Sequence, residues 1–163
     1  MKKRNLKGFT LIELIVVIAI IGVLAAILVP AMMGWVRKSS INAANSNAKS
    51  IFTNAQTVAQ EMETNGITAP SSPAIGAIAT GTGTVGSRSF EEEVNACMTS
   101  SSANATWAVQ FETANPYVVE AATFSSNGQS YTGGFPNSCP TDNNVAWDAS
   151  TGNLGSAVTG GTW

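Results

Sequence analysis

The sequence predicts an α+β protein in which one long N-terminal helix packs on a three- to four-stranded antiparallel sheet. Residues 9–30 form an almost unbroken apolar run, and from Ile41 to Met62 apolar residues return every three or four positions, as in an amphipathic helix. From Trp107 onward apolar and polar residues alternate, which is typical of half-buried strands. A helix with an apolar stripe and a sheet with an apolar face bury these surfaces against each other.

The apolar run is long enough to cross a membrane. About 21 residues at ~1.5 Å each reach ~31 Å, the thickness of the hydrocarbon core of a bilayer. The run has no polar stripe, so it requires lipid or other copies of itself on all sides. The cations that precede it place the N-terminus in the cytoplasm and export the rest of the chain; they are Lys2, Lys3, Arg4 and Lys7.

Residues 1–8 are predicted to be a leader peptide. In an ordinary secretory signal the small residue at the cleavage site follows the apolar core, whereas Gly8 precedes it. Cleavage after Gly8 would remove the four leader cations and keep the apolar segment as an anchor.

The residues around this junction, KGFTLIE, and the apolar run that continues to Pro30 resemble the N-terminus of type IV pilin precursors with a short leader, and of the related pseudopilins. In that family a membrane-bound peptidase cleaves between the residues matching Gly8 and Phe9 and then N-methylates the new terminus. The resemblance implies a pilin-like fold and a structural subunit of a type IV pilus. It also implies a single-pass membrane protein before assembly and a cell-surface pilus afterwards.

The partners implied by the resemblance are the prepilin peptidase and methylase, the pilus assembly platform, membrane lipid before assembly, and further copies of the chain in a helical filament. Glu13 is the one acid in the apolar run, and a charge there is unfavourable without a partner. In the family this glutamate pairs with the N-terminal amine of a neighbouring subunit, here that of Phe9, which sets the register between helices. A lone acid that reaches the interface of a plain signal anchor is the alternative.

Two residues predict a weak point in the helix. Gly22 lowers helix propensity, and Pro30 lacks the N–H that a helical hydrogen bond needs, so a kink is predicted at Pro30. Trp35, followed by Arg37 and Lys38, fits the outer membrane interface, with a core position in the domain as the alternative.

Residues 31–66 are predicted to form the amphipathic half of the same helix, which ends at Asn65 and Gly66. Its apolar stripe consists of Ile41, Ala44, Ala48, Ile51, Phe52, Ala55, Val58, Ala59 and Met62. The predicted organisation is a leader at 1–8, a long helix at 9–66, of which 9–30 form the transmembrane half and filament core, and an extracytoplasmic globular domain at 67–163.

Within the domain, residues 68–87 are rich in small residues and proline and predict a surface loop. Ser89 and Glu92 have the spacing of a capping box, which predicts a short helix towards Met98. Strands are predicted over 107–112 and 117–124, and further strands over 129–132 and 145–148.

Cys97 and Cys139 are predicted to form a disulfide, because the predicted topology exports both to a compartment where disulfides persist. Two buried thiols are the alternative. No metal site is predicted, since two isolated cysteines without any histidine do not make one.

Composition argues for a structural protein rather than an enzyme. The chain has no histidine and none of the usual catalytic or phosphate-binding motifs, so no cofactor is predicted. Removal of the leader takes four of the eight cations and leaves 4 − 10 = −6, an acidic surface that argues against direct nucleic-acid binding. The alternatives are a pseudopilin of a type II secretion or competence system and a membrane-anchored extracellular adhesin.

Overall fold

The computed structural model describes residues 9–70, 89–98, 105–126, 131–141, 145–146, 148 and 152–160, and the backbone of 74–77. The chain forms two compact units, Met1–Arg37 and Lys38–Trp163.

Helix α1, Leu11–Thr64, is continuous over 54 residues and contains Pro30. The predicted stripe is confirmed in its second half, where Ile41, Ala44, Ala48, Ile51, Ala55, Val58 and Ala59 are buried and Phe52 and Met62 pack against the core. The helix ends as predicted: Gly66 adopts a φ of +65°, and Ile67 N donates to Met62 O at 2.9 Å, the bond that closes a Schellman motif.

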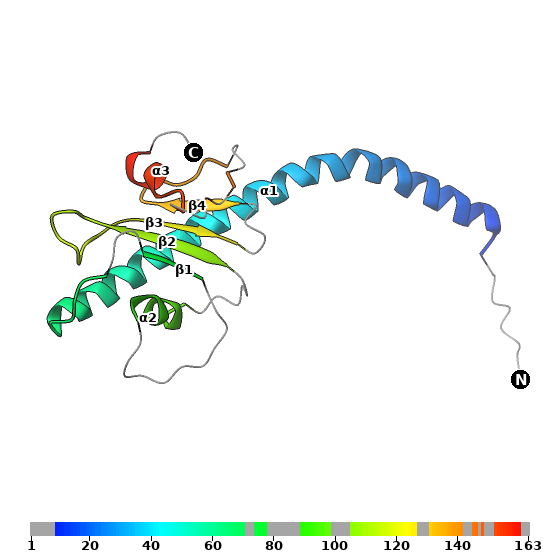
Figure 1. Cartoon of the computed structure of the whole chain (residues 1–163). Helices are drawn as coiled ribbons and strands as arrows, with labels where there is room; N and C mark the ends of the chain where they lie inside the picture. Colours follow the sequence, from blue (N-terminus) through cyan, green and yellow to red (C-terminus); the bar gives the residue numbers. More distant parts are fainter. Residues whose placement is uncertain are drawn as a thin grey trace, which may run out of the picture. The chain divides into compact units, whose positions relative to one another are not determined.

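The sheet has four antiparallel strands in the order β1-β2-β3-β4, which are β1 (Ala74–Ala77), β2 (Thr106–Phe111), β3 (Val119–Ser125) and β4 (Thr132–Phe135). Figure 1 shows them side by side. The prediction of an antiparallel sheet is confirmed, whereas the assignment of residues 68–87 to a loop was wrong where β1 lies. Its four residues, AIGA, are too few to show an alternating pattern, and pairing with β2 makes them a strand.

A β-bulge changes which residues of β3 face the helix. Gln110 pairs with Ala121 but Phe111 pairs with Val119, so Glu120 is an extra residue in β3. The core therefore contains Val119, Ala122 and Phe124 rather than one alternating set. In β2 the predicted face is confirmed, since Trp107, Val109 and Phe111 all lie in the core cluster.

Two short helices complete the domain. Helix α2, Phe90–Ala96, begins with the predicted capping box between Ser89 and Glu92 and packs on β1. Helix α3, Leu154–Thr159, contacts β2, β3 and β4, and Gly152, two residues before the helix, accepts a hydrogen bond from Thr123 of β3.

The strand predicted over 145–148 was wrong for the residues described there, 145, 146 and 148. Val145 O accepts a hydrogen bond from Thr132 N, but residues 145, 146 and 148 are not part of a strand.

Candidate functional site

The N-terminus of α1 is closed by a capping box that was not predicted from the sequence. Thr10 N and Thr10 Oγ1 both donate to Glu13 Oε2, at 2.9 and 2.6 Å, and Glu13 N donates back to Thr10 Oγ1 at 3.4 Å. The signal was present as Thr-x-x-Glu immediately before an apolar helix. Glu13 thus has donors within its own chain, and both of them reach the same carboxylate oxygen, Oε2.

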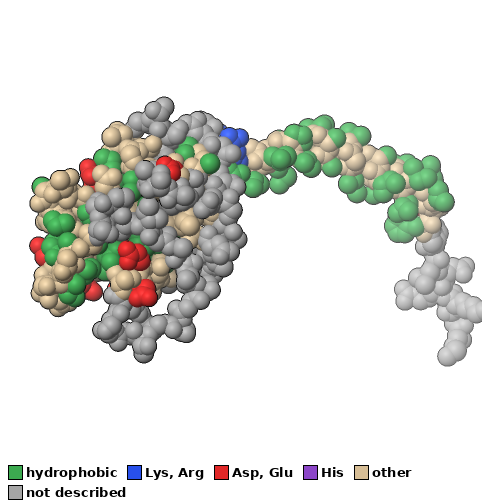
Figure 2. All heavy atoms as spheres, in the orientation of Figure 1, with side chains coloured by type: hydrophobic (Ala, Val, Ile, Leu, Met, Phe, Trp, Pro, Cys, Tyr) green, Lys and Arg blue, Asp and Glu red, His purple; other side chains and the backbone are tan. Residues whose placement is uncertain are grey.

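Beyond this cap α1 exposes its apolar side chains on every side. Each large hydrophobic residue from Phe9 to Val36 is between 46% and 91% exposed. Figure 2 shows these side chains along the first part of the helix. Within the described part of the chain α1 is the one helix long and apolar enough to cross a membrane. Trp35 is 78% exposed, so it is not a core residue of the domain.

The predicted processing site lies partly outside the described residues. Gly8 belongs to the undescribed segment 1–8, whereas Phe9 is described, lies just before the cap and is 91% exposed. At the predicted kink, α1 continues through both Gly22 and Pro30. The kink itself and the cleavage and methylation sites stay predictions.

The disulfide predicted between Cys97 and Cys139 is contradicted by this structure. Both are thiols: Cys97 is exposed at the C-cap of α2, and Cys139 is buried in the segment after β4. Asn54 Nδ2 donates to Cys97 O at 3.4 Å, whereas Asn45 Nδ2 donates to Cys139 O at 2.9 Å.

The physical reason is that the two cysteines lie against opposite sides of α1. Asn45 and Asn54 are nine residues apart, which in a helix means half a turn around the axis and about 13.5 Å along it. A disulfide requires a Cα separation of about 4.4–6.8 Å. Burial also raises the pKa of the Cys139 thiol, because the apolar surroundings disfavour the thiolate.

Two amide side chains attach α1 to the sheet, and neither was predicted from the sequence. Asn45 Oδ1 accepts from Gly134 N at 3.0 Å and from Cys139 N at 2.9 Å, in addition to its bond to Cys139 O. A Cβ at Gly133 would overlap the main chain of Ala44 and Asn45, so the helix and β4 touch backbone to backbone.

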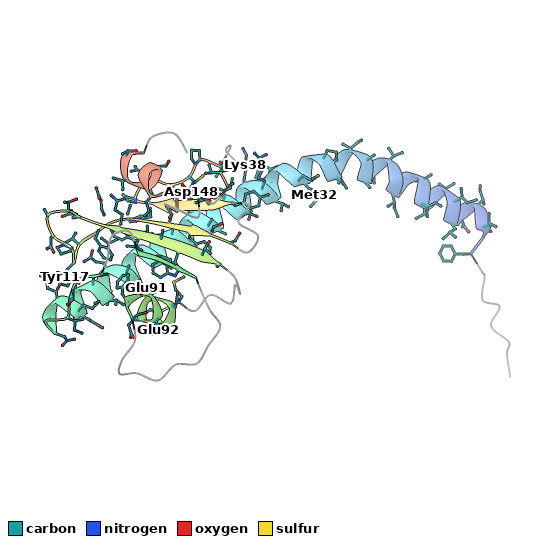
Figure 3. All side chains as sticks on the ribbon, viewed as in Figure 1. Met32, Lys38, Glu91, Glu92, Tyr117 and Asp148 are labelled. Atoms are coloured by element: carbon teal, nitrogen blue, oxygen red, sulfur yellow. The ribbon has the colours of Figure 1, made fainter. Side chains whose placement is uncertain are left out.

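Gln56 makes the corresponding attachment further along α1. Its Nε2 donates to Tyr117 O at 3.1 Å, and its Oε1 accepts from Val119 N at 2.8 Å. The hydroxyl of Tyr117 in turn donates to Ile67 O at 2.7 Å, close to the end of α1 (Figure 3). Asn45 and Gln56 each follow a buried residue of the apolar stripe, Ala44 and Ala55 respectively. This position beside the stripe was the sequence feature that could have indicated their contact with the sheet.

The titratable groups described in the domain do not assemble into a metal-binding cluster. No group of three or more Cys, Asp or Glu side chains lies close enough to hold an ion among the residues with described positions. The geometry is that of a structural protein: an apolar helix open on all sides that continues into the core of an α+β domain. This combination defines a pilin-like protein.

Comparisons with known proteins give the same assignment. Residues 3–29 match the family described as the prokaryotic N-terminal methylation motif. The chain is 57% identical over 44 residues to the fimbrial protein EcpC of Eikenella corrodens, covering 27% of this chain and 29% of that protein. It is 47% identical over 47 residues to the type IV major pilin protein PilA of Myxococcus xanthus, covering 29% and 21%. The N-terminal segment is therefore similar to that of type IV pilins.

A pseudopilin is also among the relatives. The chain is 41% identical over 51 residues to the type II secretion system core protein G of Pseudomonas aeruginosa, covering 31% of this chain and 36% of that protein. The matched segments thus span between a fifth and somewhat over a third of these three relatives, 21% to 36% of their length. No solved structure matches the chain.

Proposed function

We propose that this chain is a structural subunit of a type IV pilus, made as a membrane-anchored precursor and polymerised through the apolar part of α1. The observation that carries the proposal is the exposure of every large apolar side chain between Phe9 and Val36. Such a surface is unstable in water and needs lipid or other apolar helices. A helix that is apolar on all sides suits both environments in turn, the bilayer first and a bundle of its own copies afterwards.

The proposed topology has the N-terminus in the cytoplasm and the domain outside before assembly, and the domain on the cell surface in the pilus. The proposed processing is cleavage between Gly8 and Phe9 followed by N-methylation of Phe9. The prepilin peptidase and methylase and the pilus assembly platform are the partners in these steps. Intact-mass measurement of the mature protein tests this directly: it should lack residues 1–8 and carry one methyl group, and a retained leader would contradict the proposal.

Glu13 has two proposed roles, which variants can separate. Within its own chain it caps α1 through Thr10. Between chains it pairs with the methylated amine of Phe9 in a neighbouring copy, because a buried amine without a partner is strongly unfavourable. Glu13→Gln keeps an acceptor for the cap and removes the charge, whereas Thr10→Val removes the hydroxyl of the cap and keeps the charge.

The assembly test compares membrane-bound and sheared filament fractions of the wild type with those of Glu13→Val, Glu13→Gln and Thr10→Val. Both Glu13 variants should insert in the membrane, since removing a charge favours partitioning into lipid. Both should lose filaments, because the amine of Phe9 in the neighbouring copy then has no charged partner. Thr10→Val should still form filaments. Processing is measured in the same samples, so that a cleavage defect is not mistaken for an assembly defect. Filament loss in Thr10→Val equal to that in Glu13→Val would show that the cap, not the charge pair, is what assembly requires.

A pseudopilin of a type II secretion or competence system is the second candidate, favoured by the similarity to the type II secretion core protein of Pseudomonas aeruginosa. Electron microscopy of cells that express the full chain separates the candidates. Long surface filaments built mainly of this chain support the pilus subunit. Secretion or uptake that depends on the chain without such filaments supports the pseudopilin, and a chain that stays in the membrane fraction supports an anchored adhesin.

A further inference from the structure

The apolar surface of the first part of α1 is longer than the hydrocarbon core of a bilayer is thick. Exposed apolar side chains extend from Phe9 to Val36, and residues 14–36 include no charged side chain. At the helical rise this run measures about 40 Å, against about 30 Å for the hydrocarbon core. Immersing the whole run would need a tilt of about 40°, twice the average of about 20° for membrane helices. Lipid therefore covers only part of the run.

Apolar area does not decide which part is covered. The excess of about 10 Å can be left outside the hydrocarbon at the start of the run or at its end. Each end carries a similar set of large exposed apolar side chains. At the start these are Phe9, Leu11, Ile12 and Leu14, and at the end they are Met32, Met33, Trp35 and Val36. Because the free energy of transfer is roughly proportional to apolar area, leaving out either set is about equally unfavourable.

The polar groups at the start of α1 favour a position outside the hydrocarbon. Glu13 carries a charge, which is unfavourable there. The capping box supplies acceptors to the N–H groups of Thr10 and Glu13. Because α1 begins at Leu11, helical geometry leaves the N–H groups of Leu11 and Ile12 without an acceptor in the helix itself. Headgroups and water offer such acceptors and lipid tails do not, so the first turn belongs at the membrane surface.

The other end of the run favours a position in the bilayer. The side chains of Met32 and Met33 are apolar and exposed on α1, and Met32 is labelled in Figure 3. Trp35 follows them and is also exposed, and the cations Arg37 and Lys38 come directly after it. An aromatic ring followed by basic side chains is the arrangement found where membrane helices leave the hydrocarbon, because the indole N–H and the cations reach the headgroups. The boundary of the hydrocarbon on this side therefore lies at Trp35.

We propose that before assembly the lipid tails cover residues 15–35 of α1 rather than 9–30, so that Glu13 and its cap lie among the headgroups on the cytoplasmic side. Counting back about 30 Å, or about 20 residues, from Trp35 reaches Ile15. A tilt of about 20° moves this limit by roughly one residue. The proposal rests on the proposed function, in which lipid surrounds this part of α1 before other copies do. It leaves the apolar side chains from Phe9 to Leu14 to be covered by other copies on assembly.

Spin labels measure this depth in the full-length chain, reconstituted in vesicles of phosphatidylethanolamine and phosphatidylglycerol. A nitroxide deep in the bilayer meets dissolved oxygen but not a water-soluble nickel chelate, so the two relaxation effects give its depth. Cys97→Ser removes the exposed thiol, and this variant without a new cysteine is the control for any label on the buried Cys139. In that background the labelled variants are Ile12→Cys, Ile20→Cys, Ala25→Cys and Met32→Cys.

The deepest label should be at Ala25, the midpoint of residues 15–35, and the label at Met32 should lie about 9 Å deeper than the label at Ile12. A deepest label at Ile20, with Ile12 deeper than Met32, would show that residues 9–30 are covered and would overturn the proposal. Equal depths at Ile12 and Met32 would indicate a steep tilt and would also overturn it. Both results leave the membrane anchor in place. Access of the nickel chelate to all four labels would overturn the membrane-anchored precursor of the proposed function as well.

Discussion

Asn45→Ala should destabilise the domain more than any other single removal of an α1 amide. The change removes three hydrogen bonds, from Gly134 N and Cys139 N and to Cys139 O. Each contributes about 1 kcal/mol net, and more where the abandoned group stays away from water. Because Asn45 is half-buried and water reaches part of the site, we expect a loss of about 2–4 kcal/mol in the free energy of unfolding.

Asn54→Ala is the matched control in the same helix. Asn54 makes one long bond, 3.4 Å to Cys97 O, and a contact with the sulfur of Met98 at 3.2 Å. Its replacement should cost less than about 1 kcal/mol. Both variants exchange asparagine for alanine in a helix, so the gain in helix propensity cancels in the comparison.

The assay is urea unfolding of the full chain in detergent micelles, followed by near-UV circular dichroism, which reports the packed domain. Stability differences follow from the shift in midpoint at constant slope. Asn45→Asp should fall between the wild type and Asn45→Ala, because it keeps the acceptor and loses only the donor to Cys139 O. Equal midpoints for Asn45→Ala and Asn54→Ala would refute the claim that Asn45 attaches β4 to the helix.

Two further predictions follow from the same region. Gly133→Ala should lower the free energy of unfolding by about 3 kcal/mol or more in the same urea assay, because the new methyl group meets main-chain atoms of Ala44 and Asn45, which cannot move aside as a side chain can. Gly155→Ala is the control: this glycine lies in α3 with nothing within 4 Å of the added Cβ, so the variant should be neutral or slightly stabilising. A similar loss of stability in both variants would contradict the close contact at Gly133. Alkylation of exported protein without reductant should label Cys97 and leave Cys139 unlabelled until the chain is unfolded. The reason is that Cys97 is exposed, whereas Cys139 is buried and its thiol has a raised pKa. If both cysteines were protected until reductant is added, the disulfide between them would be supported instead.

Elements with a local cause were predictable from the sequence. The stripe from Ile41 to Met62 repeats with the period of a helix, and the Ser89 to Glu92 spacing caps α2 through its own side chains. The cap at Thr10 and Glu13 is equally local and was overlooked because the acid was interpreted through its position in the apolar run. Strand β1 and helix α3 were missed because four and six residues are too short to display a period.

The sequence by itself determined that the chain has an apolar anchor, an amphipathic continuation and an antiparallel sheet, since each follows from the spacing of apolar residues along one segment. Only the tertiary structure decided which side chains meet across segments. It placed Cys97 and Cys139 on opposite sides of α1, shifted the inward face of β3 at Glu120, and brought Asn45 to the segment after β4. The periodicity of apolar residues shows which side of a helix or strand is buried. It does not show which distant residue packs there: Asn45 and Cys139 are 94 positions apart along the chain, and they meet because of how the elements pack.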